Sequence, residues 1–222
     1  MSVVASGLGS AAVSASTSPV LWYLNRGSGV VLLLLLTLTV LLGVLATGRT
    51  MRPWWPRFVT QGLHRALAAL TMGLLAGHVV SAVVDEFVDI RWWQAFSPLG
   101  ATYEPFWLGL GTLSLDLLLL VVVTSVLRDH LPQRVWFATH LLTYAAWALS
   151  VVHGLGIGTD AGRGWLWWPT LASVVLVVTA GVARLVMARA RRGAEVEAGT
   201  EPAHGIRTSG VEELERVLET HR

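Results

Sequence analysis

Four histidines lie inside apolar stretches that are long enough to cross a lipid bilayer. They are His64 and His78 in residues 62–84, and His140 and His153 in residues 135–157. An ionisable side chain inside a membrane span is costly, and such a residue usually has a function. At a rise of about 1.5 Å per residue, the two histidines of each stretch would lie about 20 Å apart along a helix. One histidine of each stretch would then lie towards each face of a hydrocarbon core that is about 30 Å thick.

The two stretches are predicted to cross in the same direction, which makes His64 level with His140 and His78 level with His153. Imidazole pairs at two depths are the arrangement that two six-coordinate b-type haems would need, with one ligand from each helix on each iron. We therefore predict that these four side chains ligate two haem b groups. On an ideal helix the step from His140 to His153 turns the second side chain by about 140°, so this span must twist, tilt or bend, or its haems must lie on different flanks.

The composition is that of an integral membrane protein. Hydrophobic residues make up 54% of the 222 residues, charged residues only 14%, and the mean hydropathy is +0.60. The absence of cysteine excludes disulfides, iron–sulfur clusters and covalently attached c-type haem. All 16 basic residues are arginines against 14 acids, and this small excess indicates no nucleic-acid partner.

Five stretches are long and apolar enough to be transmembrane helices, so the predicted fold is an all-α bundle of five membrane-spanning helices. They are residues 29–47, 62–84, 106–127, 135–157 and 167–188. Lipid cannot satisfy an open backbone, which makes helices the only spanning structure for runs of this length. The arginines concentrate after the first stretch, between the third and fourth, and after the fifth. The positive-inside rule therefore predicts an external N-terminus and a cytoplasmic C-terminus, in a multi-pass protein of the bacterial inner membrane.

The chain is expected to have three parts. Residues 1–20 are interpreted as a flexible N-terminal segment, residues 21–190 as the membrane domain, and residues 191–222 as a cytoplasmic tail. In the tail, a linker-like stretch precedes "SGVEELERVLE", which has a capping-box pattern and predicts a short amphipathic helix. That helix is either solvated or a docking element. The loop "DEFVDIRWWQAFSPLGATYEP" is expected to cover the external surface.

The spacing of the histidines, with thirteen intervening residues in one helix and twelve in the other, resembles that of the ferric reductase-like transmembrane domain. That family includes ferric reductases, NADPH oxidases and the haem-bearing membrane subunit of the bacterial methionine sulfoxide reductase system. The segments "LWYLNRGSG", "LGLGTLSLDLLL", "TSVLRDHL" and "HGLGIGTD" add to the resemblance, which covers about residues 20–190. It implies that His64 with His140, and His78 with His153, bind two b haems that carry electrons across the bilayer.

The chain departs from the pattern of this family after the membrane domain. Ferric reductases and NADPH oxidases continue into cytosolic flavin and nicotinamide domains, whereas about thirty residues follow residue 190 here, too few for such a domain. We therefore expect the donor to be another molecule, either a cytoplasmic flavoprotein reductase or a quinol, with the flavin or quinone on that partner or at the membrane interface. The external acceptor would be ferric iron, a periplasmic reductase or oxygen. Two imidazoles leave no open position on iron, so the acceptor would be reduced by outer-sphere transfer.

Several other residues could take part. Arg26 and Arg65 could pair with the negatively charged propionates of the haems, and Arg26 corresponds to an arginine of the family that the chain resembles. Asp116 is a carboxylate well inside a span, where it would serve as a proton carrier, as a partner for a buried hydroxyl, or in a structural role. Tyr144 and Trp147 lie between the histidines of one helix, at the edge of the path between the haems or simply in the packing.

The sequence thus predicts an oxidoreductase component that transfers electrons across the membrane. Two alternatives remain open at this stage. The chain could be the haem-bearing anchor subunit of a quinone-linked or periplasmic reductase complex. It could also be a transporter in which the histidines bind metal ions or relay protons.

Overall fold

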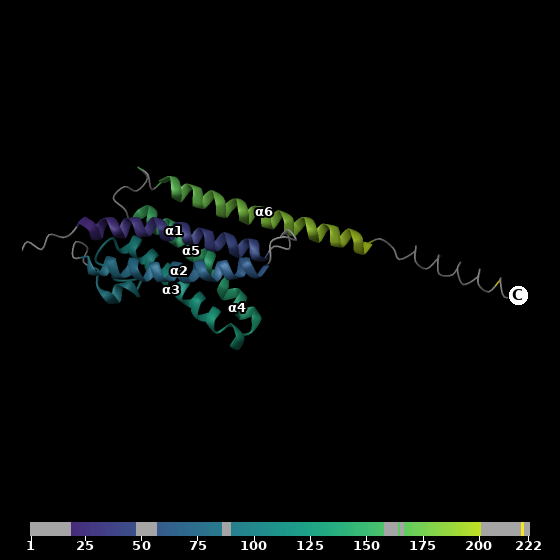
Figure 1. Ribbon diagram of the computed structural model, residues 1–222, viewed down its shortest axis with the longest axis horizontal. Coiled ribbons are helices and arrows are strands. Elements are labelled where there is room, and N and C mark those ends of the chain that lie inside the picture. The colour runs from purple at the N-terminus through teal and green to yellow at the C-terminus, as the bar shows by residue number, and fades with distance from the viewer. Residues whose placement is uncertain are drawn as a thin grey trace, which may run out of the picture. The chain divides into compact units, whose positions relative to one another are not determined.

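The computed structural model describes residues 19–47, 57–85, 90–157, 164, 167–200 and 219, and in these residues all regular structure is helical. In chain order the elements are α1 (Pro19–Thr47), α2 (Arg57–Val84), the short 3₁₀ helix η1 (Trp92–Ala95), α3 (Pro105–Val126), the 3₁₀ helix η2 (Arg128–His130), α4 (Gln133–His140), α5 (Leu142–Gly156) and α6 (Trp167–Thr200) (Figure 1). The predicted all-α class is confirmed for this part of the chain.

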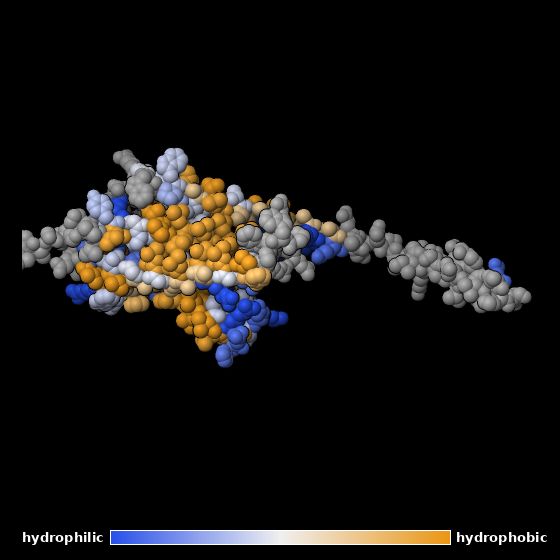
Figure 2. Space-filling view, in the orientation of Figure 1, coloured by the Kyte–Doolittle hydropathy of each residue, from blue (hydrophilic) through white to orange (hydrophobic). Residues whose placement is uncertain are grey.

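Five helical segments are long and apolar enough to cross a membrane, as predicted. They are Tyr23–Ala46, Phe58–Val84, Pro105–Val126, Gln133–Gly156 and Trp167–Val196. Which face of the membrane each end meets stays a prediction. Figure 2 shows apolar side chains in a continuous band over one face of the molecule, with hydrophilic side chains gathered near α4.

Three helices extend beyond their predicted ends, among them α2, which begins at Arg57 rather than near residue 62. α1 begins at Pro19 rather than near residue 29, and proline is favoured in the first turn of a helix because it has no N–H to leave unpaired. α6 continues to Thr200, through residues that were predicted to be a linker. Its sequence there, "RRGAEVEAGT", contains alanine, glutamate and arginine, whose high helix propensity outweighs the two glycines.

The membrane helices pack as two antiparallel hairpins, α1 with α2 and α3 with α5. In the first hairpin Asn25 of α1 donates to the backbone oxygen of His78 near the far end of α2. In the second, Ser114 of α3 donates to the backbone oxygen of Ala146 of α5. A shared apolar core joins the hairpins, and it consists of Leu36, Val40, Leu118, Ala146, Trp147, Val151 and Val177.

The fourth membrane span is interrupted between α4 and α5 at Leu141, directly after His140. Neither proline nor glycine occurs near this point. Instead, the Thr143 hydroxyl donates to the backbone oxygen of His140 over 2.8 Å, which provides a polar partner beside the interruption. The interruption is slight, because Leu141 keeps helical angles (φ −66°, ψ −20°) and its N–H donates to the backbone oxygen of Phe137. The twist or bend expected from the spacing of His140 and His153 stays a prediction.

The connection between α2 and α3 folds onto the end of α3 through a buried amide. The Gln94 side chain is 1% exposed; it accepts from the backbone N–H of Arg91 over 3.0 Å and donates to the backbone oxygen of Gly100 over 3.1 Å. The Thr112 hydroxyl of α3 donates to the backbone oxygen of Gln94 over 3.1 Å. These bonds hold the described part of the connection, residues 90–104, over one end of the hairpins.

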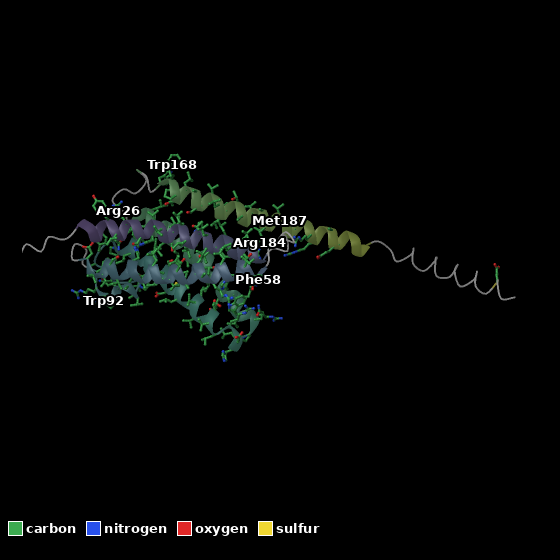
Figure 3. All side chains as sticks on the ribbon, in the orientation of Figure 1. Arg26, Phe58, Trp92, Trp168, Arg184 and Met187 are labelled. Carbon is green, nitrogen blue, oxygen red and sulfur yellow. The ribbon has the colours of Figure 1, made fainter. Side chains whose placement is uncertain are left out.

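Aromatic and arginine side chains mark the ends of the bundle. Figure 3 places Arg26 and Trp92 at one end and Phe58 at the other. Aromatic side chains at both ends are typical of the two interfaces of a membrane protein.

The chain divides into two compact units, residues 1–178 and residues 179–222. In the second unit the structure describes the later part of α6 and Glu219. The boundary between these units therefore falls inside α6, and the predicted end of the membrane domain at residue 190 stays a prediction. The amphipathic tail helix predicted around Val211 and Leu214 lies outside the described residues, as does the predicted flexible segment up to residue 18.

Candidate functional site

His64 of α2 and His140 of α4 face each other across the hairpins. Their ring centroids are 6.2 Å apart and the ring planes are inclined by 57°. A metal–imidazole bond is about 2.0 Å long. The two rings are therefore near enough to each other for both to be candidate ligands of one metal ion.

His78 of α2 and His153 of α5 line one cavity of about 290 Å³, which is close to the lower end of the range for small-molecule pockets. The cavity extends along α1 from Asn25 to Leu36, eleven positions further on, which is about 16 Å of helix. Its walls are mostly apolar, and Arg26 and Tyr103 are among its polar members. The cavity is partly open, and its elongated, mostly apolar lining, with the charged side chains of Arg26 and Asp85, suits an apolar ligand that carries a polar edge.

Each of the four imidazoles has its Nδ1 atom within hydrogen-bonding distance of a partner on a neighbouring helix. The distances are 3.0 Å from His64 to the backbone oxygen of Thr39, 2.8 Å from His153 to the backbone oxygen of Trp107, 2.9 Å from His78 to the hydroxyl of Ser28, and 3.5 Å from His140 to the hydroxyl of Ser125. Among the described residues, none of the four Nε2 atoms makes a hydrogen bond.

For two of the histidines the partner also determines which nitrogen carries the proton. A carbonyl oxygen only accepts, so Nδ1 of His64 and of His153 must be the protonated nitrogen. Ser28 lies 2.9 Å from both the backbone oxygen of Asn25 and Nδ1 of His78, so a Ser28 hydroxyl that donates to Asn25 accepts from His78. Metal-binding histidines usually have this arrangement. The ring nitrogen that does not bind the metal donates its hydrogen to a carbonyl or another acceptor, and the lone pair of the other ring nitrogen is free for the metal.

Small residues on α1 and α3 make room for the imidazoles at matching intervals. Gly29 and Gly43 lie fourteen positions apart on α1, and a Cβ atom on them would lie 3.5 Å from His78 and 3.6 Å from His64. On α3, Gly111 faces His153, and Ser125, fourteen positions further on, faces His140. Each hairpin therefore places two small residues opposite two histidines, with the same helical separation.

The space between the two histidine levels is filled by Trp147. Its indole N–H donates to the Thr37 hydroxyl of α1 over 3.0 Å, and the Thr37 hydroxyl donates to the backbone oxygen of Leu33. Both side chains are buried. Tyr144, which was predicted alongside Trp147, is 37% exposed.

The two predicted arginines differ in position. Arg26 lines the cavity of His78 and His153. Arg65 follows His64 in α2, its side chain is exposed, and it does not line this cavity. Asp116 is partly buried on α3 and is not among the cavity residues. No group of three or more His, Asp or Glu side chains that could hold a metal ion occurs within the described ranges.

A family model described as a domain of unknown function (DUF8596) matches residues 20–160, which is more than half of the chain. The chain belongs to this family. The DUF8596 region contains both hairpins and all four histidines, whereas α6 lies beyond it. No curated protein and no solved structure matches the chain.

Within the DUF8596 region, sequence reasoning identified the imidazoles but missed the groups that hold them. Ser28, Ser125 and the backbone oxygens of Thr39 and Trp107 had no individual signal. The spacing of Gly29 and Gly43 did offer one, because it equals the spacing of His64 and His78. Because α1 and α2 pack antiparallel and both spacings are fourteen residues, Gly29 meets His78 and Gly43 meets His64.

Proposed function

We propose that this protein transfers electrons across a membrane by means of two b-type haems, one at the His64–His140 pair and one at the His78–His153 pair. The observation that carries the proposal is the orientation of four imidazoles, each with Nδ1 beside a partner on a neighbouring helix and with no hydrogen bond at Nε2 among the described residues. Haem, when bound, supplies reversible one-electron chemistry at its iron.

The donor set supports a porphyrin. A porphyrin already surrounds its iron with four nitrogens, so it needs two further ligands, and each pair supplies two imidazoles. At the His64–His140 pair the ring centroids, 6.2 Å apart, are near enough for both imidazoles to be ligands of one metal ion. At the His78–His153 pair the mostly apolar cavity would hold the macrocycle, and Arg26 lies where a propionate could be neutralised.

The chain itself would perform three tasks. The Nδ1 bonds fix the rotation of each imidazole and raise its basicity as a ligand. The apolar core around Trp147 excludes water between the two levels. The two hairpins fix the separation of the levels, at about 20 Å of helix rise between His64 and His78.

The arginine distribution and the resemblance to the ferric reductase-like domain support the direction of transfer. A cytoplasmic flavoprotein or a membrane quinol would deliver electrons at the His64–His140 level. An external acceptor, such as ferric iron, a periplasmic reductase or oxygen, would take them at the His78–His153 level. With these partners the protein would act as an oxidoreductase component in a bacterial inner membrane.

The test is a reduced-minus-oxidised absorbance spectrum of the purified chain, combined with chemical quantification of haem. We expect a b-type spectrum and two haems per chain. Purified protein in liposomes that contain a reductant should then reduce an impermeant external acceptor. A colourless protein that carries zinc would refute the proposal in favour of a transporter. A catalytic subunit that copurifies in fixed ratio would instead indicate a haem-bearing anchor.

A further inference from the structure

The turn between α3 and α4 contributes two side chains to a stack that ends on His140. The Trp136 ring lies against the His140 imidazole, with centroids 5.1 Å apart and planes inclined by 26°. The guanidinium carbon of Arg128, from η2, lies 4.5 Å from the centroid of the Trp136 ring. A cation, an aromatic ring and an imidazole thus follow one another from the end of the bundle to the candidate metal site.

The indole N–H of Trp136 lacks an acceptor among the described residues. Its Nε1 atom is shielded from solvent, and no hydrogen-bond partner lies within reach. A buried donor without an acceptor is costly, and the N–H of a buried tryptophan usually has a partner. This atom therefore indicates a group that binds here from outside the described chain.

The charge beside this ring indicates which kind of group fits. The guanidinium of Arg128 lies over the face of the Trp136 ring. A cation and a neutral N–H donor together favour an acceptor that carries negative charge. An oxyanion meets both requirements, because its oxygens accept from the N–H while its charge is balanced by the guanidinium.

We propose that Trp136 Nε1 and Arg128 bind an oxyanion beside His140. The oxyanion is the propionate of a porphyrin held by the His64–His140 pair, or the phosphate of a phospholipid headgroup. Only the first source rests on the proposed function. It is favoured by the shielding of Nε1, because a carboxylate that arrives with the ligand of His140 reaches a buried donor more readily than a headgroup that stays at the interface.

The experiment uses the full chain in phospholipid-free detergent, labelled with ¹⁵N at its indole nitrogens. The Trp136→Phe variant identifies the Trp136 signal by its loss, and it also keeps an aromatic ring against His140. The probes are ferrous haem, ferrous haem dimethyl ester, which has no free carboxylates, and phosphatidylglycerol added to the haem-free protein. Haem affinity is measured in parallel for Trp136→Phe, for Arg128→Gln and for the control Arg134→Gln, which removes a charge from α4 outside the stack.

We expect haem to move the Trp136 N–H signal downfield and the dimethyl ester to bind without that movement. Trp136→Phe and Arg128→Gln should weaken haem binding at this pair about tenfold, since bonds to charged groups are the stronger ones, and Arg134→Gln should not. Movement with phosphatidylglycerol alone would assign the oxyanion to the lipid.

The proposal is overturned if neither haem nor phosphatidylglycerol moves the signal, or if haem and its dimethyl ester move it equally. Its failure is distinct from failure of the proposed function. Haem that binds with no effect at Trp136 refutes only the oxyanion site. A chain that binds no haem refutes the electron-transfer proposal, and the phosphatidylglycerol arm then decides whether the oxyanion site exists.

Discussion

Each histidine pair joins one imidazole of α2 to one imidazole of the fourth span, yet the two pairs are held differently. At the His78–His153 pair both Nδ1 atoms have partners within 2.9 Å, and the described part of the α2–α3 connection contributes Tyr103 to the cavity wall. At the His64–His140 pair, His140 has a partner only at 3.5 Å and lies directly before the interruption at Leu141. Ligand positions that match along the helices therefore do not make equivalent sites.

The difference comes from the fourth span. His153 belongs to the regular helix α5, and its Nδ1 is fixed by a backbone carbonyl, which cannot rotate away. His140 is the last residue of α4 and depends on a rotatable hydroxyl and on the Trp136 ring. We therefore expect the His78–His153 pair to bind its ligand more tightly and to tolerate fewer changes.

The largest expected effect is loss of a ligand histidine. His64→Ala and His78→Ala should each reduce the haem content from two to one per chain, and the double variant should have none, because each proposed site depends on both imidazoles of its pair and loses half of its protein ligands. Pyridine haemochrome analysis measures this directly. His130→Ala, a change in η2 outside both pairs, is the control. If His64→Ala removed both haems, the two sites would not be independent, and the comparison would fail.

The next effect concerns Gly111, where a Cβ atom would lie 2.6 Å from the His153 ring. Gly111→Ala should displace His153 and remove the haem at the His78–His153 pair while the other haem stays. Gly29→Ala is the matched control, since its Cβ would lie in ordinary contact at 3.5 Å from His78. Haem content and the spectrum of the remaining haem provide the measurement. Equal tolerance of both variants would contradict the described packing.

A moderate effect is expected from the serines that contact the imidazoles. Loss of a group that orients a metal ligand commonly costs about 10–100-fold in affinity. Ser28→Ala should therefore weaken haem binding at the His78–His153 pair by roughly tenfold. Ser125→Ala should change the other pair less, because its contact with His140 is 3.5 Å long. Haem transfer to apomyoglobin gives both rates. A larger effect of Ser125→Ala would reverse the ranking of the two pairs.

The smallest effect on the sites should come from Trp147. Trp147→Phe removes the hydrogen bond to Thr37 and leaves a small cavity between the levels, which should lower the free energy of unfolding by about 1–3 kcal/mol. Both haems should remain, because neither pair contacts its ligand through this side chain. Unfolding in mixed detergent micelles measures the change, and Tyr144→Phe is a partly exposed control. Loss of either haem would show that Trp147 shapes a site directly.

Much of this architecture could be predicted from sequence because lipid imposes simple rules. Apolar runs of about twenty residues gave the five spans, and a fixed rise per residue gave the two levels of His64, His78, His140 and His153. Helix ends were less predictable, as the extension of α6 to Thr200 shows. There the local propensity of alanine and glutamate mattered more than the turn-like composition.

The supporting contacts could not be predicted because they depend on tertiary packing. No proline or glycine marks the interruption at Leu141 in the sequence. A backbone oxygen that accepts a hydrogen bond, such as that of Thr39, has no sequence signature at all. Arg65 and Arg26 were both predicted to pair with haem propionates, yet only Arg26 lines the described cavity. Whether an arginine reaches the cavity depends on the rotation of its helix, and that rotation is determined by the helices that pack against it.

Each histidine pair takes one imidazole from α2, in the first hairpin, and one from the fourth span, which consists of α4 and α5. During synthesis the first hairpin enters the membrane with half of both sites, and no partner exists for His78 until His153 has left the ribosome. Under the proposed function, cofactor insertion is therefore one of the last steps of biogenesis. The bound cofactors would then tie the two hairpins together at both levels.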